Sequence, residues 1–209
     1  QSDLFLTEFT LAKRGKDLLF KNNLSIPRDA KIIITISRLV KKNAVGDLIS
    51  AVEFLDGNTH LLILGSGELE VGLKTLSKQK NLENRVHFLR NIGQDELPKY
   101  LWAGDVFCRP SLSEGLGIAF LEALAAGVPV VATKVGGIPD FLIDGETGLF
   151  CEVNNPEDIA KKIKEILDNQ ELGSKLINNG KKLVEEKYNW NLIAGKIENI
   201  FVNLCKRES

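Results

Sequence analysis

The chain has 209 residues, of which 44% are hydrophobic and 26% charged, and its formal net charge is −1. These values are typical of one soluble globular domain, or of a domain with a helical extension, and argue against a general nucleic-acid-binding protein. The three cysteines are far apart in the sequence, and only two histidines are present. The cysteine positions exclude the usual zinc-ligand spacings, and two histidines offer few candidates for a Ser-His-Asp triad.

No apolar run is long enough to span a bilayer, and the first residues carry Asp3 and Glu8 where a signal peptide would be apolar. The three cysteines are odd in number and far apart, so we expect free thiols in a reducing compartment. We therefore expect a cytoplasmic protein, with peripheral membrane contact of the full-length protein left open. Because the chain contains no methionine, we expect a fragment or a processed product.

Strand and helix patterns alternate along most of the chain. A short amphipathic helix is expected over residues 14–26, ended by Pro27, and is followed by a β-branched strand over 31–37. Continuing along the chain, we expect helix 46–55, strand 60–65, helix 68–81, strand 85–89, helix 96–104, strand 105–110, helix 117–127, strand 128–133, strand 148–153, and helices 155–169, 171–188 and 190–207.

Continuous apolar strands that alternate with helices predict an α/β fold. We expect a Rossmann-like parallel sheet of about six strands with helices on both faces, followed by C-terminal helices. In such sheets ligands bind at the carboxyl ends of the strands. The loops that should carry function are therefore those over residues 37–45, 65–68, 89–95, 110–117 and 133–140.

The strongest functional signal is the segment over residues 110–140, which leads from a strand end into a helix. Gly115 and Gly117 flank a turn before the helix, and Glu114 precedes it, with Glu122 eight positions later. At a rise of about 1.5 Å per residue, the two carboxylates could stand roughly 10 Å apart and bind two parts of one elongated ligand. Because the helix is apolar all round, we expect Glu122 to be buried and to have partners.

This segment resembles the E-x7-E motif of glycosyltransferase family 4, the group 1 retaining glycosyltransferases with the GT-B fold. The resemblance extends from about Leu6 to about Cys205, and residues 95–163 follow the family pattern almost without gaps. It implies that Glu114 holds hydroxyls of the donor sugar and that Glu122 holds the ribose diol. It also implies that main-chain amides of Gly115, Leu116, Gly117, Ile118 and Ala119 meet the sugar and the diphosphate.

Two cations follow the first buried strand, at Arg38 and Lys42. Cations near a helix start can clamp a diphosphate and neutralise the charge that develops on it as it leaves. The resemblance implies this catalytic role for an arginine and a lysine. Many members place the lysine five residues after the arginine, where this chain has Asn43, so Lys42 is the nearest substitute. A glycine frequent in the family is replaced by Ala44.

The glycines after the second strand, Gly65 and Gly67, resemble a family loop that makes room for the nucleotide. The loop is not the dinucleotide fingerprint G-x-G-x-x-G, because position 70 is Glu. The absence of the third glycine argues against a nicotinamide enzyme.

Residues 86–92 correspond to the strand and loop that recognise the base in the relatives, which makes Val86, Phe88 and Ile92 our base-pocket candidates. Arg90 stands where the family usually has a glycine. His87 alternates with apolar neighbours, so we interpret it as structural.

The resemblance divides the chain into an interdomain connection over residues 1–30, a nucleotide-sugar-binding domain over 31–188, and a C-terminal helix over 189–209 that would pack on a missing N-terminal domain. It implies retaining transfer from a UDP-, GDP- or ADP-sugar, without a metal or other cofactor. The acceptor could be a glycan, a lipid or a small molecule. Without the acceptor domain, the chain is expected to bind the donor but not to transfer sugar.

Three other classes remain open from the residues alone. The first is a binding or regulatory module without chemistry. The second is a nucleotide-sugar epimerase or a phosphorylase, the latter needing a lysine for a pyridoxal cofactor. The third is a nicotinamide enzyme, which the missing third glycine disfavours.

Overall fold

The computed structural model describes residues 24, 26–90 and 92–189, together with 194–195, 197–198 and 202. The expected helix over residues 14–26 and the connection over 1–30 lie mostly outside the described residues. Most of the expected helix over 190–207 lies outside them as well.

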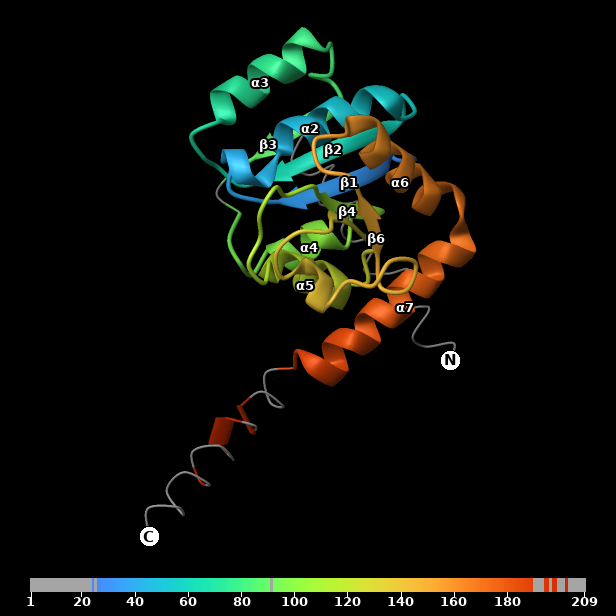
Figure 1. The fold of residues 1–209 in the computed structure, drawn as a ribbon. Coiled ribbons are helices and arrows are strands. Elements are labelled where there is room, and N and C mark those ends of the chain that lie inside the picture. Colours follow the sequence, from blue (N-terminus) through green and yellow to red (C-terminus); the bar gives the residue numbers. More distant parts are fainter. Residues whose placement is uncertain are drawn as a thin grey trace.

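The described part is built on one sheet of six parallel strands in the order β3-β2-β1-β4-β5-β6 (Figure 1). The strands are β1 Lys31–Ile36, β2 Thr59–Leu64, β3 Val86–Leu89, β4 Val106–Arg109, β5 Val130–Thr133 and β6 Leu149–Cys151. This order is that of the doubly wound Rossmann type. The predicted fold class and the six predicted strands are therefore confirmed.

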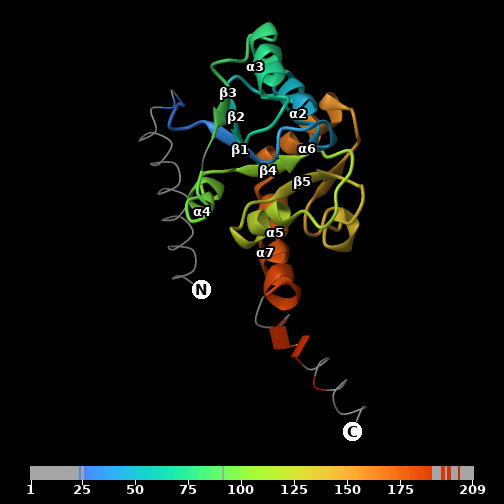
Figure 2. The same ribbon diagram turned by 90° about the vertical axis from the view of Figure 1, so that its left-hand side faces the viewer.

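Helices cover both faces of the sheet (Figures 1 and 2). One face packs against α2 and α6, and the other packs against α4 and α5, while α7 runs beside α5. The helices are α2 Val45–Ala51, α3 Glu70–Gln79, α4 Leu97–Leu101, α5 Ile118–Ala125, α6 Pro156–Asp168 and α7 Gln170–Lys187. Short 3-10 turns lie at Lys41–Asn43, Val52–Phe54 and Ile138–Asp140. Each of these helices and turns overlaps a helix or loop that the sequence predicts.

Two apolar layers form because successive side chains of a strand point to opposite faces of the sheet. Ile33 packs with the α2 and α6 layer, whereas Ile32 and Ile34 pack with the α4 and α5 layer. All six residues of β2 are buried. Each fully buried apolar side chain contributes about 1.5–3 kcal/mol relative to exposure, so the continuous apolar runs are explained by burial on both faces.

The start of α6 illustrates how local sequence sets a helix boundary. Pro156 occupies the first helical position, and the side chain of Asn155 accepts a hydrogen bond from the main-chain N–H of Asp158 at 3.0 Å. The preformed φ of proline and the capping oxygen both favour a helix beginning here.

The strand order indicates at which edge of the sheet a ligand can bind. The chain runs outward from β1 to β3 on one side and from β4 to β6 on the other. A crevice therefore opens between the carboxyl ends of β1 and β4, where the connections diverge. Arg38 follows β1, and Arg109 is the last residue of β4.

Ala44 joins the 3-10 turn after β1 to α2 with a φ of 49°, in the left-handed region. A Cβ atom is strained there, whereas glycine is not. We expect Ala44→Gly to raise the free energy of unfolding by about 0.5–1 kcal/mol, measured by urea denaturation. Asn81→Gly is the control, since Asn81 has a similar φ of 53° but asparagine tolerates it better. A loss of stability on Ala44→Gly would contradict the assignment.

Candidate functional site

A cavity of about 700 Å³ opens at the carboxyl edge of the sheet, among the ends of β1, β2 and β4 and the start of α5. This volume is in the range of small-molecule sites. The lining residues are Ile36, Ser37, Arg38, Leu64, Gly65, Ser66, Arg109, Glu114, Leu116, Gly117, Ile118 and Ala119. Seven of the residues predicted from the sequence are among them: Arg38, Gly65, Glu114, Leu116, Gly117, Ile118 and Ala119.

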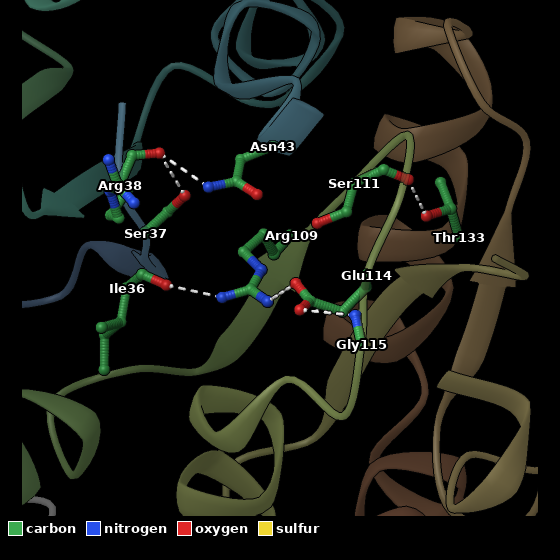
Figure 3. Close-up of polar contacts among 9 residues, drawn as sticks. All are labelled: Ile36, Ser37, Arg38, Asn43, Arg109, Ser111, Glu114, Gly115 and Thr133. Carbon is green, nitrogen blue, oxygen red and sulfur yellow. Dashed lines mark hydrogen bonds and ion pairs between the residues drawn. The ribbon is translucent and has the colours of Figure 1, made fainter. Parts of the chain in front are cut away.

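The loop that carries Arg38 is braced through its main chain (Figure 3). The Arg38 carbonyl accepts hydrogen bonds from Asn43 Nδ2 at 2.7 Å and from Ser37 Oγ at 2.9 Å. Asn43 is buried, and the Arg38 side chain is exposed at the cavity. Asn43 therefore fixes the loop and leaves Arg38 free to meet a ligand.

Lys42 lies outside this cavity. Its side chain is exposed, and its main-chain carbonyl accepts a hydrogen bond from the Leu112 N–H at 2.7 Å. The structure therefore connects Lys42 to the loop after β4 through its backbone, and Lys42 is not among the residues that line the cavity with Arg38.

Arg109 is a cavity residue that the sequence analysis passed over. Its Nη2 forms an ion pair with Glu114 Oε2, and its Nη1 donates to the Ile36 carbonyl at 3.2 Å (Figure 3). Its guanidinium carbon also lies 4.5 Å from the centre of the Phe120 ring. Burial lowers the pKa of Arg109 and Glu114 opposes that shift, so the group stays cationic at neutral pH. A lone charge at the end of the apolar strand VFCR was the signal that could have found it.

The Glu114 carboxylate is held from both sides. Oε2 pairs with Arg109, and Oε1 accepts from the Gly115 N–H at 3.0 Å (Figure 3). The loop after β5 supports the same segment, because the Gly137 N–H donates to the Glu114 carbonyl at 3.3 Å. Gly115 does not line the cavity, and its part is to anchor the carboxylate.

The first turn of α5 forms one wall of the cavity. Gly117 precedes the helix with a φ of 69°, and Ile118 and Ala119 line the cavity. Unpaired N–H groups and the helix dipole make such a helix start favourable for an anion. Together with Arg38, this wall can hold a negatively charged ligand.

Our expectation that Glu122 is buried was wrong. Its side chain is exposed because α5 is covered on only one side, and Ile118, one turn earlier, is 64% exposed. Residues four apart lie on the same face of a helix, so this open face leads from the cavity to Glu122. There Glu122 borders a second hollow of about 290 Å³, together with Gln94, Leu97, Pro98, Leu101, Trp102, Ala125 and Ala126.

The two glycines after β2 have different environments. Gly65 lines the cavity with a φ of 141°, and a Cβ there would lie 2.0 Å from the Ser37 carbonyl oxygen. Gly67 lies outside the cavity against the main chain of Leu39. Gly67 therefore allows the loops after β1 and β2 to approach each other, and the structure does not place it beside a ligand.

Two of the residues expected at a base pocket, Val86 and Phe88, lie together at a hollow of about 340 Å³ that His87 also lines. Val86 is buried in the core, and Phe88 packs at its edge. Ile92 packs against the α4 and α5 layer. The structure does not bring Val86, Phe88 or Ile92 into the cavity with Arg38. A loop near this strand reaches the second hollow through Gln94 instead.

Arg90, which replaces a usual family glycine, binds to α3. Its Nε donates to Glu70 Oε1 at 2.6 Å, and Lys74 also pairs with that carboxylate at 2.8 Å. These hydrogen bonds hold the pKa of Glu70 below its ordinary value. Arg90 therefore links the loop after β3 to the first turn of α3.

His87 pairs with His60 across β2 and β3, with 3.1 Å between His60 Nδ1 and His87 Nε2. Burial, followed by the charge of His60, lowers the pKa of His87 from 6.5 to about 4. Between these values the unfolded chain binds a proton that the folded chain does not, so stability falls as the pH is lowered through this window. Allowing for solvent screening, we expect a loss of about 1 kcal/mol between pH 7 and pH 5.

Urea unfolding at pH 7 and pH 5 measures this loss. His87→Asn should reduce the pH dependence, because asparagine does not titrate, whereas burial still lowers the pKa of His60. An unchanged pH dependence in the variant would contradict the role of this pair.

Within the described ranges, no helix has the length and hydrophobicity needed to cross a membrane. In the same part of the chain, no three His, Cys, Asp or Glu side chains are grouped as metal ligands would be.

Comparison with known proteins relates this geometry to a family. The family model described as "Glycosyl transferases group 1" matches residues 18–183. An uncharacterized glycosyltransferase of Methanocaldococcus jannaschii is 34% identical over 184 residues, which cover 87% of this chain and 47% of the relative. The chain spans about half the length of the curated relatives that it matches.

Two solved structures show the same fold. The C-terminal domain of a group 1 family glycosyl transferase from Francisella tularensis has a TM-score of 0.72 at 27% identity, covering 81% of this chain and 91% of that one. The Anabaena protein HepE, in complex with UDP and glucose, has a TM-score of 0.84 at 20% identity, covering 91% of this chain and 52% of that one.

Proposed function

Because this chain belongs to the group 1 glycosyltransferase family, we propose that it is the donor-binding half of a retaining glycosyltransferase. The observation that carries the proposal is the convergence of Arg38, Glu114 and the start of α5 on one cavity. A cation, a helix N-terminus and a carboxylate are the groups that a diphosphate joined to a sugar requires.

The chemistry follows from how charge moves during transfer. As the bond between the sugar and the diphosphate breaks, negative charge collects on the leaving diphosphate. Arg38 and the N–H groups at the start of α5 would stabilise that charge, and preorganised groups of this kind supply a large share of catalysis. Glu114 would orient the sugar by accepting hydrogen bonds from its hydroxyls. In a retaining reaction the new bond forms on the face from which the diphosphate leaves.

The nucleoside would lie along α5 toward Glu122. The open helix face connects the cavity to the second hollow, where Glu122 could accept hydrogen bonds from the ribose diol and Trp102 contributes an aromatic wall. The UDP and glucose bound by HepE support a nucleotide-sugar ligand. UDP, GDP and ADP all remain candidates for the nucleotide.

The acceptor would bind on a second domain. Leu116 and Ile118 line the cavity and are 48% and 64% exposed. Exposed apolar side chains at a cavity mouth suit coverage by another domain, and the relatives have about as many further residues as this chain has. A glycan, a lipid or a small molecule could be the acceptor. We therefore expect the chain alone to bind a donor and not to transfer its sugar.

Isothermal titration calorimetry with UDP, GDP, ADP and NAD tests this proposal. We expect the chain to bind one nucleoside diphosphate selectively, with weaker binding of the other two and none of NAD. The visible absorption spectrum serves as a control for a pyridoxal cofactor. Preference for NAD, or failure of all three diphosphates to bind, would contradict the proposal.

A further inference from the structure

The charge balance of the cavity differs from the one that the sequence predicts. Among the described residues that line it, Arg38 and Arg109 are the cations and Glu114 is the carboxylate. Lys42, expected as the second cation, is exposed and does not line the cavity. If the proposed function is right, a diphosphate has to bind beside the negative charge of Glu114. Something must offset that charge.

Arg109 is fixed in the position that does so. Its side chain is 9% exposed, and that of Glu114 is 11% exposed. Its two terminal nitrogens are engaged by Ile36 and Glu114, and the Phe120 ring lies against the guanidinium. With both nitrogens engaged and little surface open, Arg109 is placed to act on Glu114 and not to reach out to a ligand.

Stabilisation of the fold alone does not explain the ion pair between Arg109 and Glu114. The Nε of Arg109 is buried and has no hydrogen-bond partner in the described part of the chain. An orphaned buried donor destabilises a fold, and a buried ion pair is often no more stable than apolar residues of similar size. A strand end that served only packing would favour an apolar residue here.

We infer that Arg109 is a positioning residue, which fixes the orientation of the Glu114 carboxylate and cancels its charge so that a diphosphate can bind next to it. The inference rests on the proposed function for the identity of the ligand. Gly115 holds one carboxylate oxygen and Arg109 holds the other. The carboxylate can then accept hydrogen bonds from a sugar only in the direction that this frame leaves open.

Calorimetric titration of the 209-residue chain with UDP, GDP and ADP tests the inference on R109M and R109M/E114Q. R109M leaves the carboxylate uncompensated beside the diphosphate, so we expect the Kd of the preferred diphosphate to rise about tenfold. The double variant removes that charge and should recover most of the loss. R85M is the matched control, because Arg85 donates only to main-chain carbonyls of Leu55, Asp56 and Thr59, away from the cavity.

The affinities of the two variants distinguish charge compensation by Arg109 from direct ligand binding and from packing alone. Recovery in the double variant supports charge compensation. Equal weakening in R109M and R109M/E114Q would overturn the inference, because it would mean that Arg109 binds the ligand directly or serves packing alone. Unchanged binding in R109M would also overturn it.

A double-mutant cycle, measured by thermal unfolding of R109M, E114Q and the double variant, tests without any ligand whether Arg109 and Glu114 are energetically coupled. We expect the double variant to lose less stability than the two single losses combined, because neither charge is then left unpaired. Purely additive losses would overturn the positioning role. If no diphosphate binds the wild-type chain, the proposed function fails, and this cycle still tests the Arg109–Glu114 contact.

Discussion

Replacing Arg38 with methionine is expected to weaken binding of the preferred nucleoside diphosphate about 30-fold, or about 2 kcal/mol. The reason is that Arg38 is the exposed cation of the cavity, whereas Arg109 is engaged by Glu114. A charge-assisted hydrogen bond to a diphosphate is stronger than a neutral one, and methionine keeps roughly the aliphatic stem of arginine without the guanidinium group. Calorimetric titration measures the change.

The control for this variant removes a charge from the other end of the same strand. Lys31 begins β1 at the opposite edge of the sheet, where it pairs weakly with Asp105 at 3.8 Å. Lys31→Met changes the net charge equally, so it should leave affinity nearly unchanged. Equal weakening by both substitutions would mean that the diphosphate responds to overall charge and that Arg38 has no specific contact with it.

Gly136→Ala is expected to destabilise the protein by about 3 kcal/mol or more. Gly136 has a φ of 54°, and a Cβ there would lie 1.8 Å from the Glu114 carbonyl oxygen. The left-handed conformation alone costs an alanine about 1–2 kcal/mol. The clash adds to this cost, because the loop that carries Glu114 would have to move. Thermal unfolding measures the loss, and donor binding should weaken with it.

A second glycine separates the two causes. Gly145 has a similar φ of 71°, but nothing lies within 4 Å of a Cβ built there. Gly145→Ala should therefore cost only the conformational part, about 1–2 kcal/mol. If both variants lost the same stability, the close approach of Gly136 to Glu114 would have no energetic importance.

Most of the fold could be predicted because its signals are local and repeated. The apolar runs within residues 31–37 and 60–65 are buried on both faces of the sheet, as continuous apolar strands of a parallel sheet predict. The Asn-Pro start of α6 places a helix boundary by proline geometry and capping. The family match and the solved structures agree with the Rossmann-like domain that the motif over residues 110–140 indicated.

The site was predictable where it depends on motif position and less so where it depends on side-chain direction. Glu114 and Arg38 follow strand ends, so the parallel sheet brings them together. The direction of Lys42 depends on a short 3-10 turn that ends in the left-handed Ala44, which periodicity does not reveal. The role of Arg109 could not be predicted from the strand pattern, because it depends on the contact with Glu114 that forms only in the folded chain.

The exposure of Glu122 shows a different limit. An apolar helix suggests burial, but the sequence alone does not tell what buries it. In this structure Ile118 and Glu122 share the open face of α5. If the second domain that we propose covers Ile118 and the nucleoside covers the face toward Glu122, the apolar character of α5 reflects the assembled, ligand-bound protein and not this chain by itself.

The most direct test of the donor site is the mapping of amide chemical shifts by NMR during titration of the 209-residue chain with UDP-glucose, or with the corresponding nucleotide sugar if titration selects GDP or ADP. We expect the largest changes at Arg38, at Gly65, at Glu114 and over residues 116–119, which meet at the cavity. Changes confined to the hollow lined by Val86, His87 and Phe88, or no changes at saturating ligand, would contradict this assignment.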